Sequence, residues 1–172
     1  MKLIIKIFFI LTLIISPTQL ISDTPFFLDF KYILNESDAG KKAQKFLKNR
    51  LEKGLKSIKE KELNIQEQEK KIIQQKKVLS VDEYKKKVQN LRSQVSSLQK
   101  ERNDLLETVA KQRSKARSEL LKNLNPLIKE YMNEKKIRMV VDKKSLLLAD
   151  ENLDITEEII ARLNKKLKSI KF

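Results

Sequence analysis

The chain has 172 residues, a formal net charge of +15 at pH 7, no cysteine and no histidine. It therefore lacks disulfides, thiolate metal sites, a lipid-modified cysteine and the side chain that most often binds metals or titrates near neutral pH. With 2 glycines, 3 prolines, 35% charged and 6% aromatic residues, its composition is typical of long helices stabilised by helix pairing and subunit association.

Residues 1–22 have the layout of a secretory signal peptide. Lys2 and Lys6 precede an apolar run from Ile7 to Ile15, which Ser16-Pro17 ends. Because the run is too short for a comfortable membrane span, we predict export followed by cleavage. No clean A-x-A pattern marks the cleavage position, and an uncleaved N-terminal anchor is the alternative.

The positive charge is concentrated in the middle of the chain. The stretch from Lys41 to Arg138 contains 28 basic and 13 acidic residues, whereas the rest of the chain after residue 22 contains 8 basic and 10 acidic residues. Such a segment should attract anionic partners through salt-sensitive electrostatics, although many of these lysines also fit a solvated helical face.

The first predicted elements are a short strand and a long helix. Phe26 to Leu34 is rich in aromatic and β-branched residues, which predicts a strand that ends at Asn35. Ser37 is suited to cap the helix that follows.

The first long helix has a heptad repeat with two different seam positions. One position is apolar throughout, at Leu51, Ile58, Ile65, Ile72 and Leu79. The other becomes charged toward the far end, at Leu55, Glu62, Glu69 and Lys76. This pattern predicts a coiled coil that loosens with distance from its base, and Gly54 should weaken it by roughly 1 kcal/mol relative to alanine.

The second long helix has a clear start. Ser80 and Glu83 form a capping box, and Leu79 and Tyr84 occupy the positions of a hydrophobic staple. Heptads continue from Tyr84 toward residue 130, with a kink expected at Pro126. The short turn between the two helices predicts an antiparallel hairpin.

The C-terminal part predicts a small β-containing body. Ile137–Val141 and Ser145–Ala149 read as two strands of a β-hairpin, and Asp154 should cap a final helix. The fold class is therefore mainly α with a small β body, in which residues 23–36 and 137–172 form the body and residues 37–136 form a basic coiled-coil arm. So few strands need partners, which predicts an oligomer interface at Leu28, Phe30, Val140, Val141, Leu146 and Leu148.

At this point the chain resembles the Skp (OmpH-like) family of periplasmic chaperones. The matching segments are LDFKYILNESDAGKKA (Leu28 to Ala43), the basic heptad hairpin, and IRMVVDKKSLLLADENLDITEEIIARLNKK (Ile137 to Lys166). The resemblance implies a homotrimer with a shared β-barrel core, located in the periplasm. It also implies that three arms hold unfolded outer-membrane proteins without ATP. The chain differs from the family in being richer in lysine and isoleucine, and no lipopolysaccharide contact is carried over.

No catalytic, cofactor or metal site is expected. The chain lacks both common glycine-rich phosphate loops, and acidic pairs such as Glu67/Glu69 and Glu157/Glu158 fit surface charges on helices.

Two other functions stay open. One is a structural or tethering coiled coil, which would favour a tight apolar seam along the full hairpin. The other is binding to nucleic acid or to an anionic lipid surface. Export argues against nucleic acid, as does the scarcity of aromatic residues among the basic ones.

Candidate client-binding residues lie on the arm. Basic contacts are assigned to Lys85, Lys86, Lys87 and Lys111, and weak apolar contacts to Leu63, Ile73 and Leu106 beside the main seam. For the three apolar residues, the alternative is that they only broaden the seam.

Overall fold

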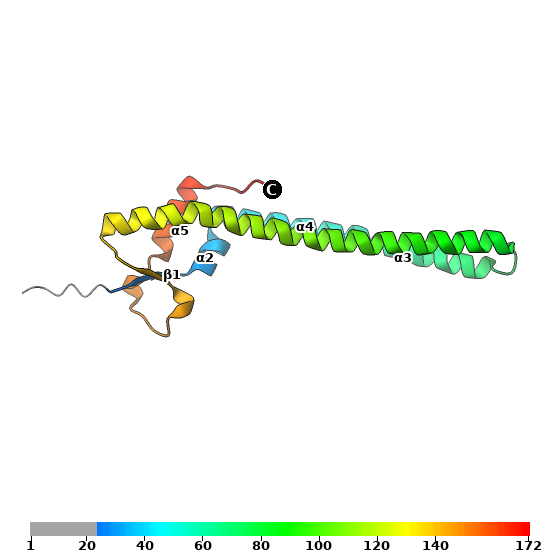
Figure 1. The fold of residues 1–172 in the computed structure, drawn as a ribbon, viewed down its shortest axis with the longest axis horizontal. Helices are drawn as coiled ribbons and strands as arrows, with labels where there is room; N and C mark the ends of the chain where they lie inside the picture. The colour runs from blue at the N-terminus through cyan, green and yellow to red at the C-terminus, as the bar shows by residue number, and fades with distance from the viewer. Residues whose placement is uncertain (1–23) are drawn as a thin grey trace, which may run out of the picture.

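The computed structural model describes residues 24–172, so the signal-peptide prediction for residues 1–22 lies outside it. Figure 1 shows a long helical hairpin that projects from a small body at one end. The elements in chain order are β1 (Phe26–Leu28), α2 (Phe30–Glu36), α3 (Asp38–Gln75), α4 (Val81–Lys135), β2 (Val140–Asp142), the 3-10 turns η1 (Lys143–Ser145) and η2 (Glu151–Leu153), and α5 (Thr156–Lys166). Within residues 24–172, no helix has the length and apolar character needed to span a membrane.

Both arm helices begin at the residues that the sequence predicts. The Ser37 hydroxyl accepts a hydrogen bond from the Gly40 backbone N–H at 3.2 Å, which caps α3. At the start of α4, the Ser80 hydroxyl accepts from the Glu83 N–H, and the Glu83 carboxylate accepts from the Ser80 N–H at 3.0 Å. These two hydrogen bonds confirm the predicted capping box. They satisfy backbone donors that have no partner inside the helix.

Helix α4 extends beyond the predicted heptads, which run toward residue 130, and Pro126 does not end it. Pro126 lies inside the helix, which continues to Lys135 and ends where Lys136 adopts a left-handed conformation with φ of 56°. A proline removes one backbone hydrogen bond, but packing of Leu124 and Leu127 in the body holds the helix on both sides of it.

The predicted strand from Phe26 to Leu34 is wrong beyond Leu28. The Asp29 carboxylate accepts a hydrogen bond from the Tyr32 backbone N–H at 2.8 Å and so caps a helix, α2, that includes Phe30. Helix α2 buries Ile33 completely in the body core. A favourable cap and this burial outweigh the strand preference of the surrounding aromatic and β-branched residues.

The predicted β-hairpin is also wrong. Strand β2 pairs with β1 in parallel, with Phe26 opposite Val140 and Leu28 opposite Asp142. The Asp142 carboxylate accepts from the Lys144 N–H at 3.2 Å, which turns the chain into η1, and residues 146–149 form no strand. Two parallel strands that lie side by side need a long connection between them, and in this chain α2 and the whole arm form the connection from β1 to β2.

The core of the body lies where α2, α4 and α5 meet. Its buried residues are Leu28, Ile33, Ala39, Leu120, Leu124, Leu127, Tyr131, Ile137, Ile155, Ile159, Ile160 and Leu163. On its edge, the Arg162 guanidinium forms two hydrogen bonds with the Glu134 carboxylate and lies 4.9 Å from the centre of the Tyr131 ring. These contacts join α5 to the base of α4.

Gly40 is required where α2 packs on α3, and its replacement gives the first prediction. A Cβ atom at Gly40 would lie 2.1 Å from the Leu34 carbonyl oxygen, which is backbone and cannot rotate away. Gly40→Ala should therefore lower the free energy of unfolding by about 2–3 kcal/mol, as overpacking does elsewhere. Urea denaturation followed by circular dichroism measures the loss.

Gly54→Ala is the matched control. Its Cβ would lie 2.5 Å from a Leu105 methyl carbon, at the end of a side chain that can change rotamer. The gain in helix propensity, about 1 kcal/mol, should offset much of this contact. Equal losses for the two variants would contradict the proposed role of Gly40.

Candidate functional site

The two arm helices pack tightly near the body. The seam residues Ile58, Val109 and Ala116 are buried, and Gly54 lets the Leu105 side chain approach α3 closely. The second seam position is already half exposed at Leu55, with 42% of its surface accessible. Apolar burial is therefore concentrated along one line of each helix.

Farther along the arm, polar pairs cross between the helices. Arg102 lies 3.5 Å from the Glu62 carboxylate, and the Lys61 ammonium lies 2.6 Å from that of Glu101. The side-chain amides of Gln68 and Gln94 exchange two hydrogen bonds, at 3.0 and 3.2 Å. Partly exposed ion pairs such as the first two contribute little to stability because water and salt screen them. Fewer apolar side chains are buried in the distal arm, where Ile72 is buried, than at the root, so the predicted loosening toward the tip stays a prediction.

The structure separates the candidate lysines into two places. Lys85, Lys86 and Lys87 are exposed in the first turns of α4, at the tip of the arm. Lys111 lies ~36 Å farther along the helix, given a rise of 1.5 Å per residue. Lys111 forms an ion pair with Glu107 at 2.5 Å, and this hydrogen bond raises the pKa of the Lys111 ammonium. Only the tip lysines form a compact cluster.

The candidate apolar residues are available on the arm surface. Leu63, Ile73 and Leu106 are 48%, 61% and 50% exposed. Sequence reasoning missed two further apolar residues at the tip, Val78 and Val81, which are 82% and 70% exposed. Their positions beside the capping box were the available signal, because residues at a helix start have few neighbours to cover them.

A second exposed apolar surface lies on the body, in the segment after β2. Leu147 and Leu148 are 101% and 95% exposed, and we call this pair the apolar loop. Sequence reasoning included Leu148 in the interface but missed Leu147, although both belong to one unbroken apolar run. Of the other predicted interface residues, Leu28 is buried in the chain's own core, and Phe30 and Val140 pack against that core. Val141 and Leu146 are partly exposed.

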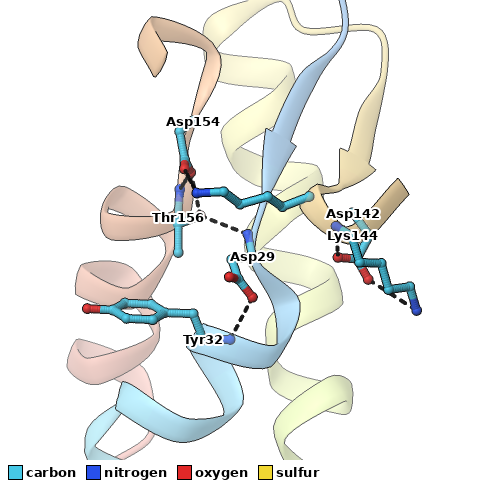
Figure 2. A network of polar contacts seen from close by, with 7 residues as sticks. Asp29, Tyr32, Asp142, Lys144, Asp154 and Thr156 are labelled. Atoms are coloured by element: carbon cyan, nitrogen blue, oxygen red, sulfur yellow. Dashed lines mark hydrogen bonds and ion pairs between the residues drawn. The ribbon is translucent and has the colours of Figure 1, made fainter. Parts of the chain in front are cut away.

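A polar network supports the body beside the apolar loop (Figure 2). The Asp154 carboxylate accepts hydrogen bonds from the backbone N–H and the hydroxyl of Thr156, and the Lys143 ammonium lies 3.3 Å from it. The Thr156 hydroxyl oxygen in turn accepts from the Asp29 N–H at 2.8 Å. Helix α5 begins at Thr156 with Ile155 as its cap residue, so the predicted cap, Asp154, stands one residue before the observed one.

This network controls the ionisation of Asp154. Partial burial by itself would raise the pKa of the Asp154 carboxyl, but the hydrogen bonds from Thr156 and Lys143 outweigh it and hold the pKa below its ordinary value of 3.8. No group of three or more metal-binding side chains occurs among the residues that the structure describes. The network is a support for the loop and for the start of α5.

The lowered pKa predicts a pH-dependent contribution to stability. Because the unfolded chain binds the proton more readily, the ionised Asp154 stabilises the fold above pH 3.8, and this contribution is lost as the pH falls through the lower folded pKa. At pH 7, Asp154→Asn should lower the free energy of unfolding by about 1.5–3 kcal/mol, the range for hydrogen bonds to charged groups. Denaturation curves from pH 7 to pH 3 should show this difference shrinking.

Asp104→Asn is the control, because Asp104 is exposed on the arm and the substitution removes the same charge. It should leave stability nearly unchanged across the same range. A difference for Asp154→Asn that is constant with pH would contradict the assignment.

Comparison with known proteins identifies the relatives of this fold. The family model described as "Outer membrane protein (OmpH-like)" matches residues 26–163. A crystal structure from Caulobacter crescentus, of an OmpH-like protein named as an outer membrane chaperone, matches with a TM-score of 0.80 and 19% sequence identity. The match covers 87% of this chain and 89% of that chain. No curated protein matches the chain significantly. The mainly helical fold with a small strand part is confirmed.

Proposed function

The chain belongs to the OmpH-like family, and we propose that it is an ATP-independent holdase chaperone of the periplasm that binds unfolded outer-membrane proteins. The observation that carries the proposal is the arm, a long basic hairpin with exposed apolar residues along it and at its tip. The likeness in fold to a protein named as an outer membrane chaperone supports it. The signal-peptide pattern in residues 1–22 supports the periplasmic location.

The arm surface suits weak and reversible binding. Its excess of lysine and arginine favours encounter with acidic chains, because complementary charge mainly raises the association rate. Exposed side chains such as Leu63, Ile73 and Val78 then offer separate apolar contacts, each too small to impose one bound structure. Release follows when the client buries its apolar surface elsewhere, and no nucleotide is needed.

We further propose that the chain works as a homotrimer assembled through the body. The two-stranded sheet of β1 and β2 is too small for independent stability, since isolated pairs of strands are marginal in water. The apolar loop beside it exposes two adjacent leucines, and monomeric proteins rarely present such patches without a partner. Three bodies joined there, through a shared β-barrel core, would place three arms around one cavity.

The trimer proposal predicts the effect of charges in the apolar loop. The double variant Leu147→Asp and Leu148→Asp should convert a trimer into a folded monomer, because buried unpaired carboxylates oppose association. Sedimentation equilibrium and circular dichroism measure the mass and the folded state.

The matched control is Val78→Asp with Val81→Asp, which places the same charges at exposed apolar positions of the arm tip. This control should remain trimeric. A loop variant with the mass of the wild type would refute the proposed interface.

The chaperone proposal predicts that client protection depends on the basic arm. Reversal of Lys85, Lys86, Lys87 and Lys111 to glutamate should reduce the suppression of aggregation of an unfolded acidic β-barrel protein severalfold at low salt. High salt should weaken protection by the wild type and narrow the gap between the proteins, because salt screens exposed charges beyond ~8 Å. Light scattering of the diluted client measures protection.

Replacement of the same four lysines by arginine keeps the charge and should preserve protection. If all three proteins protect equally at both salt concentrations, the lysines only keep the chain soluble. Protection that is absent even in the wild type would favour a tethering coiled coil. Binding to anionic vesicles, without effect on a client, would favour a lipid surface as the partner.

A further inference from the structure

The C-terminal segment 167–172 lies against the root of the arm. Beyond α5 it runs in the direction of the arm, as Figure 1 shows for the end marked C. The Phe172 ring stacks on Phe46 of α3, with ring centres 4.6 Å apart and planes 6° from parallel. The Lys168 ammonium lies 3.2 Å from the Asp38 carboxylate, and Ile170 packs against the core of the body.

Phe46 is an unusual residue for this position. Its helix neighbours Ala43 and Leu47 are buried, whereas Phe46 is still 42% exposed with Phe172 stacked on it. The ring therefore does not belong to the seam or the body core, and its described aromatic contact is with the C-terminal segment. Such a ring is a platform on which an aromatic side chain of an extended peptide can stack.

The C-terminal segment stacks its aromatic ring on this platform, but its charged side chains have the same sign as those of the neighbouring part of α3. Residues 41–50 of α3 contain five basic residues and no acidic residue, and residues 165–172 contain four lysines and no acidic residue. The ion pair between Lys168 and Asp38 is exposed to solvent, so it offsets little of this repulsion. An extended segment with an aromatic ring and negative charge would fit the same place better.

We propose that the face of α3 around Phe46 is a docking site for extended client segments that combine an aromatic residue with acidic residues. The C-terminal segment occupies this site when no client is bound. The inference rests on the proposed function, since it needs clients that are unfolded chains. The C-terminal segment is part of the same chain, so it competes for the site at a high effective concentration, and a client displaces it only by binding the site more tightly. The positive charges that the C-terminal segment shares with α3 weaken its binding and so make displacement by an acidic client possible.

Peptide binding to the purified processed chain tests the site. The probe is a fluorescein-labelled heptapeptide with the sequence of residues 166–172 in which the three lysines are replaced by aspartate. Fluorescence anisotropy should show that Phe172→Ala raises the affinity about threefold to tenfold, the range expected for loss of one competing aromatic pair. Phe46→Ala should remove this gain in the double variant. A probe with alanine in place of its phenylalanine should bind more weakly, as should the unchanged lysine sequence.

Leu55→Ala is the matched control, because Leu55 is an apolar side chain of α3 with the same exposed fraction as Phe46, 42%, and is not among the proposed client contacts, so the substitution should not alter peptide affinity. Each variant must keep the circular dichroism spectrum and mass of the wild type. Equal affinity of the wild type and Phe172→Ala overturns occupation by the C-terminal segment, and equal affinity of Phe172→Ala with and without Phe46 overturns the docking site. Client protection that persists in either case leaves the proposed chaperone function standing. Peptide binding without protection by the wild type rejects that function instead.

Discussion

The parallel pairing of β1 with β2 is the constraint on which the rest of the structure depends. Strand β1 ends at Leu28 and strand β2 begins at Val140, so α2 and the entire arm form one crossover between neighbouring strands. The Ile155 backbone N–H then donates to the Phe27 carbonyl oxygen at 2.9 Å, which ties the approach to α5 to the same strand. Both ends of the hairpin are therefore clamped to one small core, and the arm projects from a fixed base.

Stability and binding are divided along the arm. Near the body, fully buried residues such as Leu124 and Ile159 supply the apolar area that stabilises the fold. Toward the tip, cross-helix contacts become polar, as between Glu62 and Arg102 or between Gln68 and Gln94. Because the distal half has fewer buried apolar residues than the body and the root, its surface can carry lysines and exposed apolar side chains without disturbing the core of the body. This separation is what a reversible binding surface requires.

Exposed apolar groups occur at separate places with different surroundings. The apolar loop, Leu147 and Leu148, stands next to a short sheet and suits burial against another body. Val78 and Val81 are exposed at the tip among lysines, where positive charge is dense. Phe46 lies at the root beneath the chain's own Phe172. We propose assembly for the first place and client contact for the other two.

The sequence by itself determined the helical hairpin, because its signals are local. Ser37, Ser80 and Glu83 act on backbone groups within four residues, and heptad periodicity identifies the packed faces without knowledge of the body. The basic arm followed from the same stretches, whereas the family resemblance rested mainly on the segments that flank the hairpin, Leu28 to Ala43 and Ile137 to Lys166. Only the tertiary structure decided the body. Burial of Ile33 in the core favours helix α2 over the predicted strand. Strand β1 pairs with a segment more than a hundred residues away, and a three-residue strand has almost no periodicity, so the sequence carried no local signal for this pairing. The docking of Phe172 on Phe46 is equally non-local, because it depends on where α5 releases the chain and not on any pattern around either residue.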